Sequence, residues 1–292
     1  MKFEDVETAR KTYWKKLKTT LFISVSLLIL AFILAVIFHV FNKIVFYIVI
    51  FVAIIVNVVV NTKNRYIYHK TYKTYFVEQN LHRVFTDVIY DHTKGLNPSL
   101  LHATGMIDTG DAYSSNDLTI AKYKNIDFMQ ADATIKTEST DSDGHTTYTT
   151  IFKGRFMIFE FPKKFDFKLE LIGKRFHAYR VPGKDKATGR KMVKIQTEST
   201  EFNQKFKIYG QDGFEAFYIL DPAMIVRIQA ISDYYKDKVF LGFYDNKMLV
   251  GLDDRKDSFE PPKASRPINE AEEIQKIAPS IKVITDFIDA IV

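Results

Sequence analysis

The chain has 292 residues, of which 47% are hydrophobic and 26% are charged, and it contains no cysteine. This composition excludes a disordered or collagen-like chain, and the lack of cysteine excludes a disulfide framework, cysteine-ligated zinc and thiol catalysis. The formal net charge of +6 is uneven, since residues 1–75 carry +8 and residues 76–292 carry −2. Because the larger part has no excess of cations, we expect no nucleic-acid partner.

Two apolar runs near the N-terminus predict a transmembrane hairpin. Thr19–Asn42 and Ile44–Thr62 contain no Asp, Glu, Lys or Arg, and about 20 helical residues cross a bilayer core of about 30 Å. The connector is short, so the two helices must be antiparallel. The first run is longer than the apolar region of a signal peptide, and no small-residue cleavage pattern follows it. We expect a basic segment over residues 1–20 and a transmembrane hairpin over residues 21–62.

The charges that flank these runs predict their orientation. Six Lys or Arg precede the first run and four follow the second, whereas Lys43 is the only one in the connector. Cytoplasmic flanks of membrane helices are enriched in Lys and Arg. We therefore expect a cell-membrane protein with both termini in the cytoplasm.

The flanking cations are also the candidate site residues, because antiparallel helices bring both flanks to the same face of the membrane. The set is Lys15, Lys16, Lys18, Lys63, Arg65, Lys70 and Lys73. Each cation near an anionic leaflet contributes on the order of 1 kcal/mol. Two hypotheses remain open: these side chains contact lipid headgroups, or they only set the topology.

The second apolar run continues into a helical pattern, in which apolar residues recur every three or four positions. This pattern predicts a juxtamembrane helical stalk over residues 63–95. Residues 96–260 predict an α+β cytoplasmic domain of antiparallel hairpins plus helices. The strongest hairpin signal pairs Thr134–Thr140 with His145–Phe152 around an Asp-Ser-Asp-Gly turn.

Weaker patterns complete the domain. Phe176–Val181 is expected to be a strand, and Val239–Tyr244 with Met248–Leu252 a second hairpin. Asp221 and Pro222 have the residue types of a helix N-cap and first turn. Residues 261–292 predict a Pro-rich linker followed by an amphipathic C-terminal helix.

No pattern in the sequence supports catalysis or a cofactor. Asp141-x-Asp143-x-His145 begins like a calcium loop but has Phe152 where a bidentate Glu is needed. The basic loop over residues 182–191 is either solvated or a phosphate contact, and the sequence does not decide between them. P-loop, nucleophile-elbow and zinc motifs are absent from the sequence. We therefore expect no cofactor and no metal.

Three segments resemble a known family. Phe152–Phe165, Ile195–Tyr209 and Ala216–Phe243 are similar to the family catalogued as domain of unknown function 3137. The resemblance implies a bacterial, membrane-associated protein with a cytoplasmic α+β region. The family has no established activity, so the resemblance supplies no catalytic residues.

These observations favour a membrane-anchored binding or scaffold module that holds a protein or lipid partner at the membrane. The alternative is a membrane-tethered hydrolase that acts at the lipid surface. The lack of a nucleophile–base pair or a metal motif favours the module, although the enzyme question stays open. Both hypotheses are compatible with a homo-oligomer.

Overall fold

The computed structural model describes residues 1–37, 43–162, 164–165, 167–183, 189–211, 213–257 and 259–291. The connector at Asn42 and the centre of the basic loop over residues 182–191 lie outside the described residues. The chain divides into two compact units. Unit 1 contains Met1–Asn80 with Phe259–Ile277, and unit 2 contains Leu81–Ser258 with Ala278–Val292.

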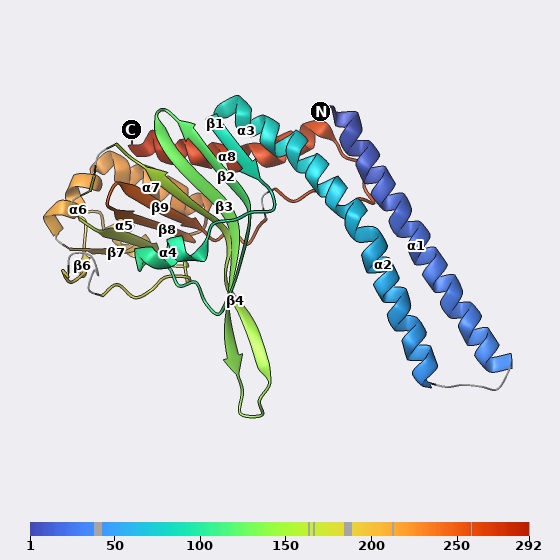
Figure 1. The fold of residues 1–292 in the computed structure, drawn as a ribbon. Helices are drawn as coiled ribbons and strands as arrows, with labels where there is room; N and C mark the ends of the chain where they lie inside the picture. Colours follow the sequence, from blue (N-terminus) through green and yellow to red (C-terminus); the bar gives the residue numbers. More distant parts are fainter. Residues whose placement is uncertain are drawn as a thin grey trace. The chain divides into compact units, whose positions relative to one another are not determined.

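Unit 1 is built on a long antiparallel helical hairpin (Figure 1). Its helices are α1 (Phe3–Ile37) and α2 (Lys43–Tyr72), and α2 continues into a π-helical turn, η1 (Lys73–Glu78). The Phe3 ring lies 6.2 Å from that of Phe76, and Tyr13 stacks on Tyr68 at the same distance. The expected two-helix hairpin is therefore present. Later residues of α1 contact earlier residues of α2, as in any antiparallel pair.

The apolar parts of both helices are exposed on almost every side. Both helices are long and apolar enough to cross a membrane, and only 6% of each apolar window is buried. The side chain of Phe22 on α1 is 74% exposed and that of Val59 on α2 is 67% exposed. A helix that is apolar all round needs an apolar surrounding, which fits lipid rather than water.

Two polar contacts join the helices within this apolar region. The Asn57 side-chain amide donates to the Ser24 hydroxyl, and the Asn61 amide donates to Thr20 Oγ1 at 2.9 Å. Both amides also donate to the carbonyl four residues earlier on α2. Asn57 therefore has a structural function as a helix–helix contact.

Unit 2 is a nine-stranded antiparallel sheet with helices, as expected for an α+β domain. The strand order is β1-β2-β3-β4-β9-β8-β5-β7-β6. The strands are β1 (Thr86–Asp91), β2 (Ala112–Tyr123), β3 (Ile126–Thr140), β4 (Thr146–Glu160), β5 (Leu169–Gly173), β6 (Val193–Ile195), β7 (Phe206–Gly210), β8 (Val239–Tyr244) and β9 (Lys247–Leu252). The helices outside the hairpin are α3 (Gln79–Val84), α4 (Pro98–Thr104), α5 (Thr200–Lys205), α6 (Gly213–Ile219), α7 (Pro222–Tyr234) and α8 (Glu270–Ile291).

Both faces of the central strands are covered, which follows from their alternating side chains. On one face Phe152 and Phe156 of β4 pack in a buried cluster with Leu101 of α4. On the other face Arg155 donates to the Ser280 carbonyl of α8 at 2.5 Å, and Phe159 lies beside Phe287. The second half of α8 therefore belongs to the core of unit 2.

Gly154 lets strands β4 and β9 approach each other closely. A Cβ at this position would lie 1.9 Å from the Leu252 carbonyl oxygen, which is a backbone atom that cannot move away easily. Glycine is therefore required here by close packing of two backbones.

The expected helical stalk over residues 63–95 is wrong beyond Val84. The helical part ends there, and residues 86–91 form β1 at the edge of the sheet. The Phe85 ring is buried against Phe128, and the Tyr90 hydroxyl donates to Asp117 of β2. These tertiary contacts override a local pattern that fits both a helix and a strand.

The expected strand over Phe176–Val181 is also wrong. This segment forms one isolated bridge, between Tyr179 and Ile107. Phe176 and Ala178 are buried, as alternating strand residues would be. The segment pairs only with the loop residue Ile107, and not with a neighbouring strand. The two predicted hairpins are present as β3–β4 and β8–β9, and Asp221 caps α7 by accepting from Met224 N.

Candidate juxtamembrane site

The segment predicted as a Pro-rich linker is a strap that crosses the helical hairpin of unit 1. We define the strap as Phe259–Asn269. The Tyr68 hydroxyl donates to the Pro262 carbonyl at 2.8 Å, and Arg10 Nη1 donates to the Ala264 carbonyl at 2.6 Å. The backbone N–H of Ile268 donates to Glu7 Oε1 at 2.9 Å. The strap is thus held by α1 and α2 together.

Proline explains why side chains hold this segment. Pro261, Pro262 and Pro267 have a fixed φ and no N–H, so they cannot donate to a ladder of strands, and the strap has a turn at residues 264–266 instead. Its carbonyls accept bonds from the buried side chains of Tyr68 and Arg10 instead.

Three glutamates, one in the strap and two at the start of α8, add further contacts to the helical hairpin. Glu260 lies 3.2 Å from the Lys73 ammonium and 3.4 Å from the His69 ring nitrogen. Glu273 accepts from the Tyr72 hydroxyl, and Glu270 accepts from that of Tyr75. These glutamates therefore attach the strap and the first turn of α8 to α2 and η1.

A cavity of about 370 Å³ lies between the strap and the two helices. Its lining comprises Tyr13, Trp14 and Leu17 of α1, Arg65, Tyr68 and His69 of α2, and residues 260–265 of the strap. The side chains from α1 are thus aromatic and apolar, whereas α2 and the strap contribute cationic and carboxylate groups. This combination suits a ligand with both polar and apolar parts.

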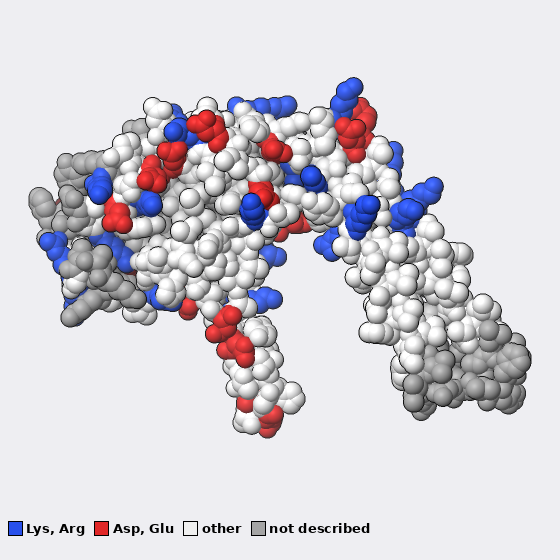
Figure 2. All heavy atoms as spheres, viewed as in Figure 1, with Lys and Arg blue, Asp and Glu red and all other residues white. Residues whose placement is uncertain are grey.

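Six of the seven predicted site residues are exposed around this end of the hairpin. We call this set the collar: Lys15, Lys16, Lys18, Lys63, Arg65 and Lys70. Figure 2 shows Lys and Arg side chains on this part of α1 and α2, next to a long stretch of both helices that carries none. Lys18 also lies 5.4 Å from the ring centre of Trp14, a cation–π contact typical of a membrane interface.

Lys73 differs from the other six cations. Its side chain is only 3% exposed, and its ammonium pairs with Glu260. A buried, paired lysine cannot reach a lipid headgroup without breaking that pair. Lys73 therefore holds the strap and is not part of the collar.

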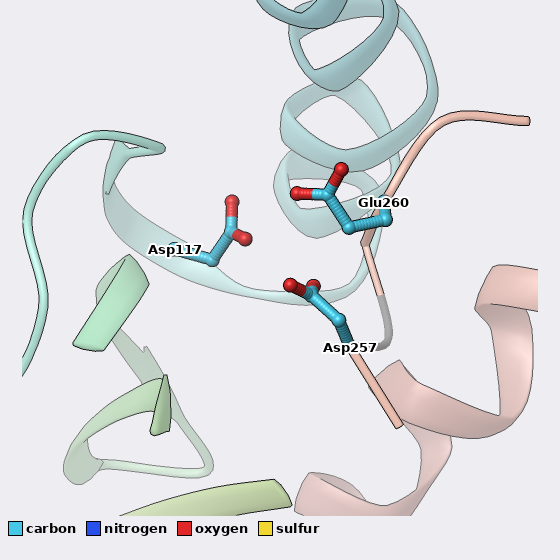
Figure 3. Close-up of side chains that lie close together, drawn as sticks. All are labelled: Asp117, Asp257 and Glu260. Atoms are coloured by element: carbon cyan, nitrogen blue, oxygen red, sulfur yellow. The ribbon is translucent and has the colours of Figure 1, made fainter. Parts of the chain in front are cut away.

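Unit 2 contains a close pair of carboxylates, Asp117 and Asp257, drawn in Figure 3. One oxygen of each lies within 4.8 Å of the other. Asp117 is 1% exposed and accepts from the Tyr90 hydroxyl at 2.5 Å and from the Asn116 amide at 2.6 Å. It also has a positive φ at a bulge of β2. These bonds indicate that Asp117 holds β1 against β2.

Within the described residues of unit 2, Asp117 and Asp257 form a pair of carboxylates, and Glu260, also labelled in Figure 3, belongs to unit 1. Asp141 Oδ1 accepts from the backbone N–H groups of Asp143 and His145, so this segment is a turn.

Sequence reasoning missed the strap and the cavity. Tyr68, Glu260 and Arg10 give no motif, because their partners lie about 190 to 250 positions away in the chain. Trp14, the only tryptophan, stands beside Lys15 and Lys16 ahead of an apolar run. That placement is a local signal of an interfacial site, as are the cations that flank the apolar runs.

Comparisons with known proteins agree with the predicted resemblance. Residues 150–291 match the family model described as "Protein of unknown function (DUF3137)", which confirms the resemblance over this part of the chain. A search of curated proteins finds no match. Among solved structures, the mycobacterial trehalose monomycolate transport factor A, TtfA, is 9% identical with a TM-score of 0.41. The match covers 77% of this chain and 96% of that chain.

Proposed function

We propose that this protein is a membrane-anchored binding module. In this proposal α1 and α2 cross the cell membrane, both termini lie in the cytoplasm, and unit 2 holds a partner on that side. The observation that carries the proposal is the collar, because six exposed cations lie next to the exposed apolar stretches of two helices.

The collar would do more than set the orientation of the helices. Each cation near an anionic leaflet contributes on the order of 1 kcal/mol, so six would provide several kcal/mol. Membrane-spanning helices need no such energy for attachment. We propose instead that it fixes the depth of the hairpin and gathers anionic lipid around it.

The test replaces four collar residues that do not line the cavity: Lys15, Lys16, Lys63 and Lys70, each by Gln. Lys2, Arg10, Lys11, Lys18, Arg65 and Lys73 remain to maintain the topology. Lipid that co-purifies with each protein is measured by mass spectrometry. We expect the anionic fraction to fall in the variant.

A matched control replaces four exposed lysines of unit 2 by Gln: Lys94, Lys136, Lys191 and Lys256. This change removes the same total charge but leaves the collar intact, so the anionic fraction should match that of the wild type. An anionic fraction that is unchanged in the collar variant would show that these cations set only the topology.

A further inference from the structure

One side of the cavity in unit 1 lies nearer to the apolar segments of the hairpin than the other side does. Leu17 and Arg65 lie on the side of the apolar segments, since α1 becomes apolar after Thr20 and α2 is apolar before Thr62. Tyr13 and His69 line the other side, one helical turn farther from these segments. A molecule anchored in lipid would therefore meet Leu17 and Arg65 first.

The charge balance of the lining leaves Arg65 available. Glu260 is the one carboxylate in the lining, and it pairs with Lys73 and His69. Arg65 is exposed and takes part in none of the ion pairs found among the described residues. Lys263 of the strap adds a second exposed cation. The lining therefore has a net attraction for an anion.

The groups present match a phosphate ester with an apolar body. A guanidinium presents several N–H donors in a planar fork that fits two oxygens of a phosphate. Trp14, Tyr13 and Leu17 offer an aromatic and aliphatic wall beside it. A volume of about 370 Å³ is at the small end of the range for ligand sites, which suits a headgroup better than a whole lipid.

We infer that this cavity binds the phosphate headgroup of a single membrane phospholipid, with Arg65 on the phosphate and Trp14 beside the glycerol. The site deepens the proposed function and rests on its placement of the hairpin in the membrane. It differs from the collar in stoichiometry, because the collar attracts many lipids and the cavity holds one.

Trp14 provides a direct readout, since it is the only tryptophan in the chain and lines the cavity. The full chain in uncharged detergent micelles is titrated with dihexanoyl phosphatidylglycerol while its fluorescence is followed. We expect a saturable change for the wild type. Dihexanoyl glycerol, which lacks the phosphate, should give no saturable change.

The matched variants are Arg65→Gln and Lys11→Gln, which each remove one exposed cation from unit 1. Arg65→Gln should weaken binding about ten- to hundredfold, as expected for loss of charge-assisted hydrogen bonds. Lys11→Gln, outside both the lining and the collar, should bind as the wild type does. Equal affinities of the Arg65→Gln protein and the wild type would overturn the inference.

A third titration with inorganic phosphate separates a lipid from a soluble ligand. We expect no saturable response at the concentrations at which the lipid saturates, and an equal response would overturn the lipid assignment. The two proposals fail separately. If Arg65→Gln binds the lipid as the wild type does while the collar variant loses anionic lipid, only the cavity proposal is refuted. If Arg65→Gln weakens binding while the collar variant keeps its anionic lipid, only the collar proposal is refuted.

Discussion

The apolar side chains of the helical hairpin in unit 1 are exposed, whereas those in the core of unit 2 are buried. In unit 1 the side chains of Leu27, Phe51 and Val59 are 55%, 64% and 67% exposed, whereas in unit 2 Phe156 and Phe240 are fully buried. Both units are rich in such residues, so hydrophobicity alone does not separate them. Their arrangement does separate them. The charge-free helices of unit 1 are apolar on every side and exposed, whereas the central strands of unit 2 are covered on both faces.

Polar groups inside the two units differ in the same way. The apolar part of the hairpin uses neutral partners such as Asn57 with Ser24. The core of unit 2 contains an ion pair, in which Arg155 Nε lies 3.3 Å from Asp132 Oδ1 and both side chains are 5% exposed. Neutral polar contacts cost less to place in hydrocarbon than charges do. We therefore expect unit 1 to need lipid or detergent and unit 2 to need neither.

The largest expected effect comes from removing the hairpin. A fragment of residues 81–292 should be monodisperse in size-exclusion chromatography without detergent, because it leaves out the exposed apolar helices. The full chain should aggregate under the same conditions. Aggregation of this fragment would contradict the contrast between the two units.

The fragment must begin before β1. A version starting at residue 96 lacks Phe85, which is buried against Phe128, and Tyr90, which donates to Asp117. Burial and the neighbouring Asp117 carboxylate raise the pKa of Tyr90, so its hydroxyl stays a neutral donor. The shorter fragment should therefore unfold at lower urea concentration, although the charge and the strand pattern of residues 96–292 alone predict a stable domain.

Breaking the buried ion pair should come next in size. Arg155→Met leaves the Asp132 carboxylate buried without its charged partner, and removal of one member of such a pair costs about 3–5 kcal/mol. Urea unfolding of the 81–292 fragment measures the loss. The double variant Asp132→Leu with Arg155→Met should recover most of it, and a double variant no more stable than the single one would show that the charge is not the cause.

A smaller loss is expected at Gly154. The Cβ of Gly154→Ala would meet the Leu252 carbonyl, so β4 and β9 must separate locally, at a cost of about 1–3 kcal/mol. Gly183→Ala is the control, since nothing lies within 4 Å of a Cβ there. If both variants unfolded at the same urea concentration, the close contact between the strands would be refuted.

The smallest effect depends on pH. Burial raises the pKa of the Asp254 carboxyl in the folded state, so its ionisation disfavours folding above that pKa. Asp254→Asn keeps the oxygen that accepts from Lys256 N, and it should stabilise unit 2 at pH 7 by less than about 1 kcal/mol after solvent screening. The gain should vanish as the pH falls below the ordinary pKa of Asp.

Asp143→Asn is the control for this pH effect, because Asp143 lies in an exposed turn. At pH 7 its stability should match that of the wild type. A gain for Asp254→Asn that persists in acid would show that its cause is not the ionisation of this carboxyl.

Local patterns in the sequence predicted the elements whose partners are close in the chain. The hairpins β3–β4 and β8–β9, the capped helix α7 and the two apolar helices were all predicted from short windows. The predictions failed at β1 and at Phe176–Val181, where the partner of a segment decides its conformation. Periodicity contains no information about such partners.

The same distinction between local and distant partners applies to the candidate site. The collar was predicted from charges next to apolar runs, since that signal is local. The strap was not, because a Pro-rich segment looks the same whether it is free or bound. Lys73 was grouped with the collar for the same reason, and only its contact with Glu260 separates it.

The central claim is that the hairpin crosses the membrane and leaves both termini and unit 2 on the cytoplasmic side. The native chain has no cysteine, so single variants Thr8→Cys, Asn42→Cys and Ser142→Cys each report one position to a membrane-impermeant maleimide. In intact cells we predict labelling at Asn42→Cys alone, with the other two labelled only after the membrane is permeabilised. Labelling of Thr8→Cys or Ser142→Cys in intact cells would contradict the account.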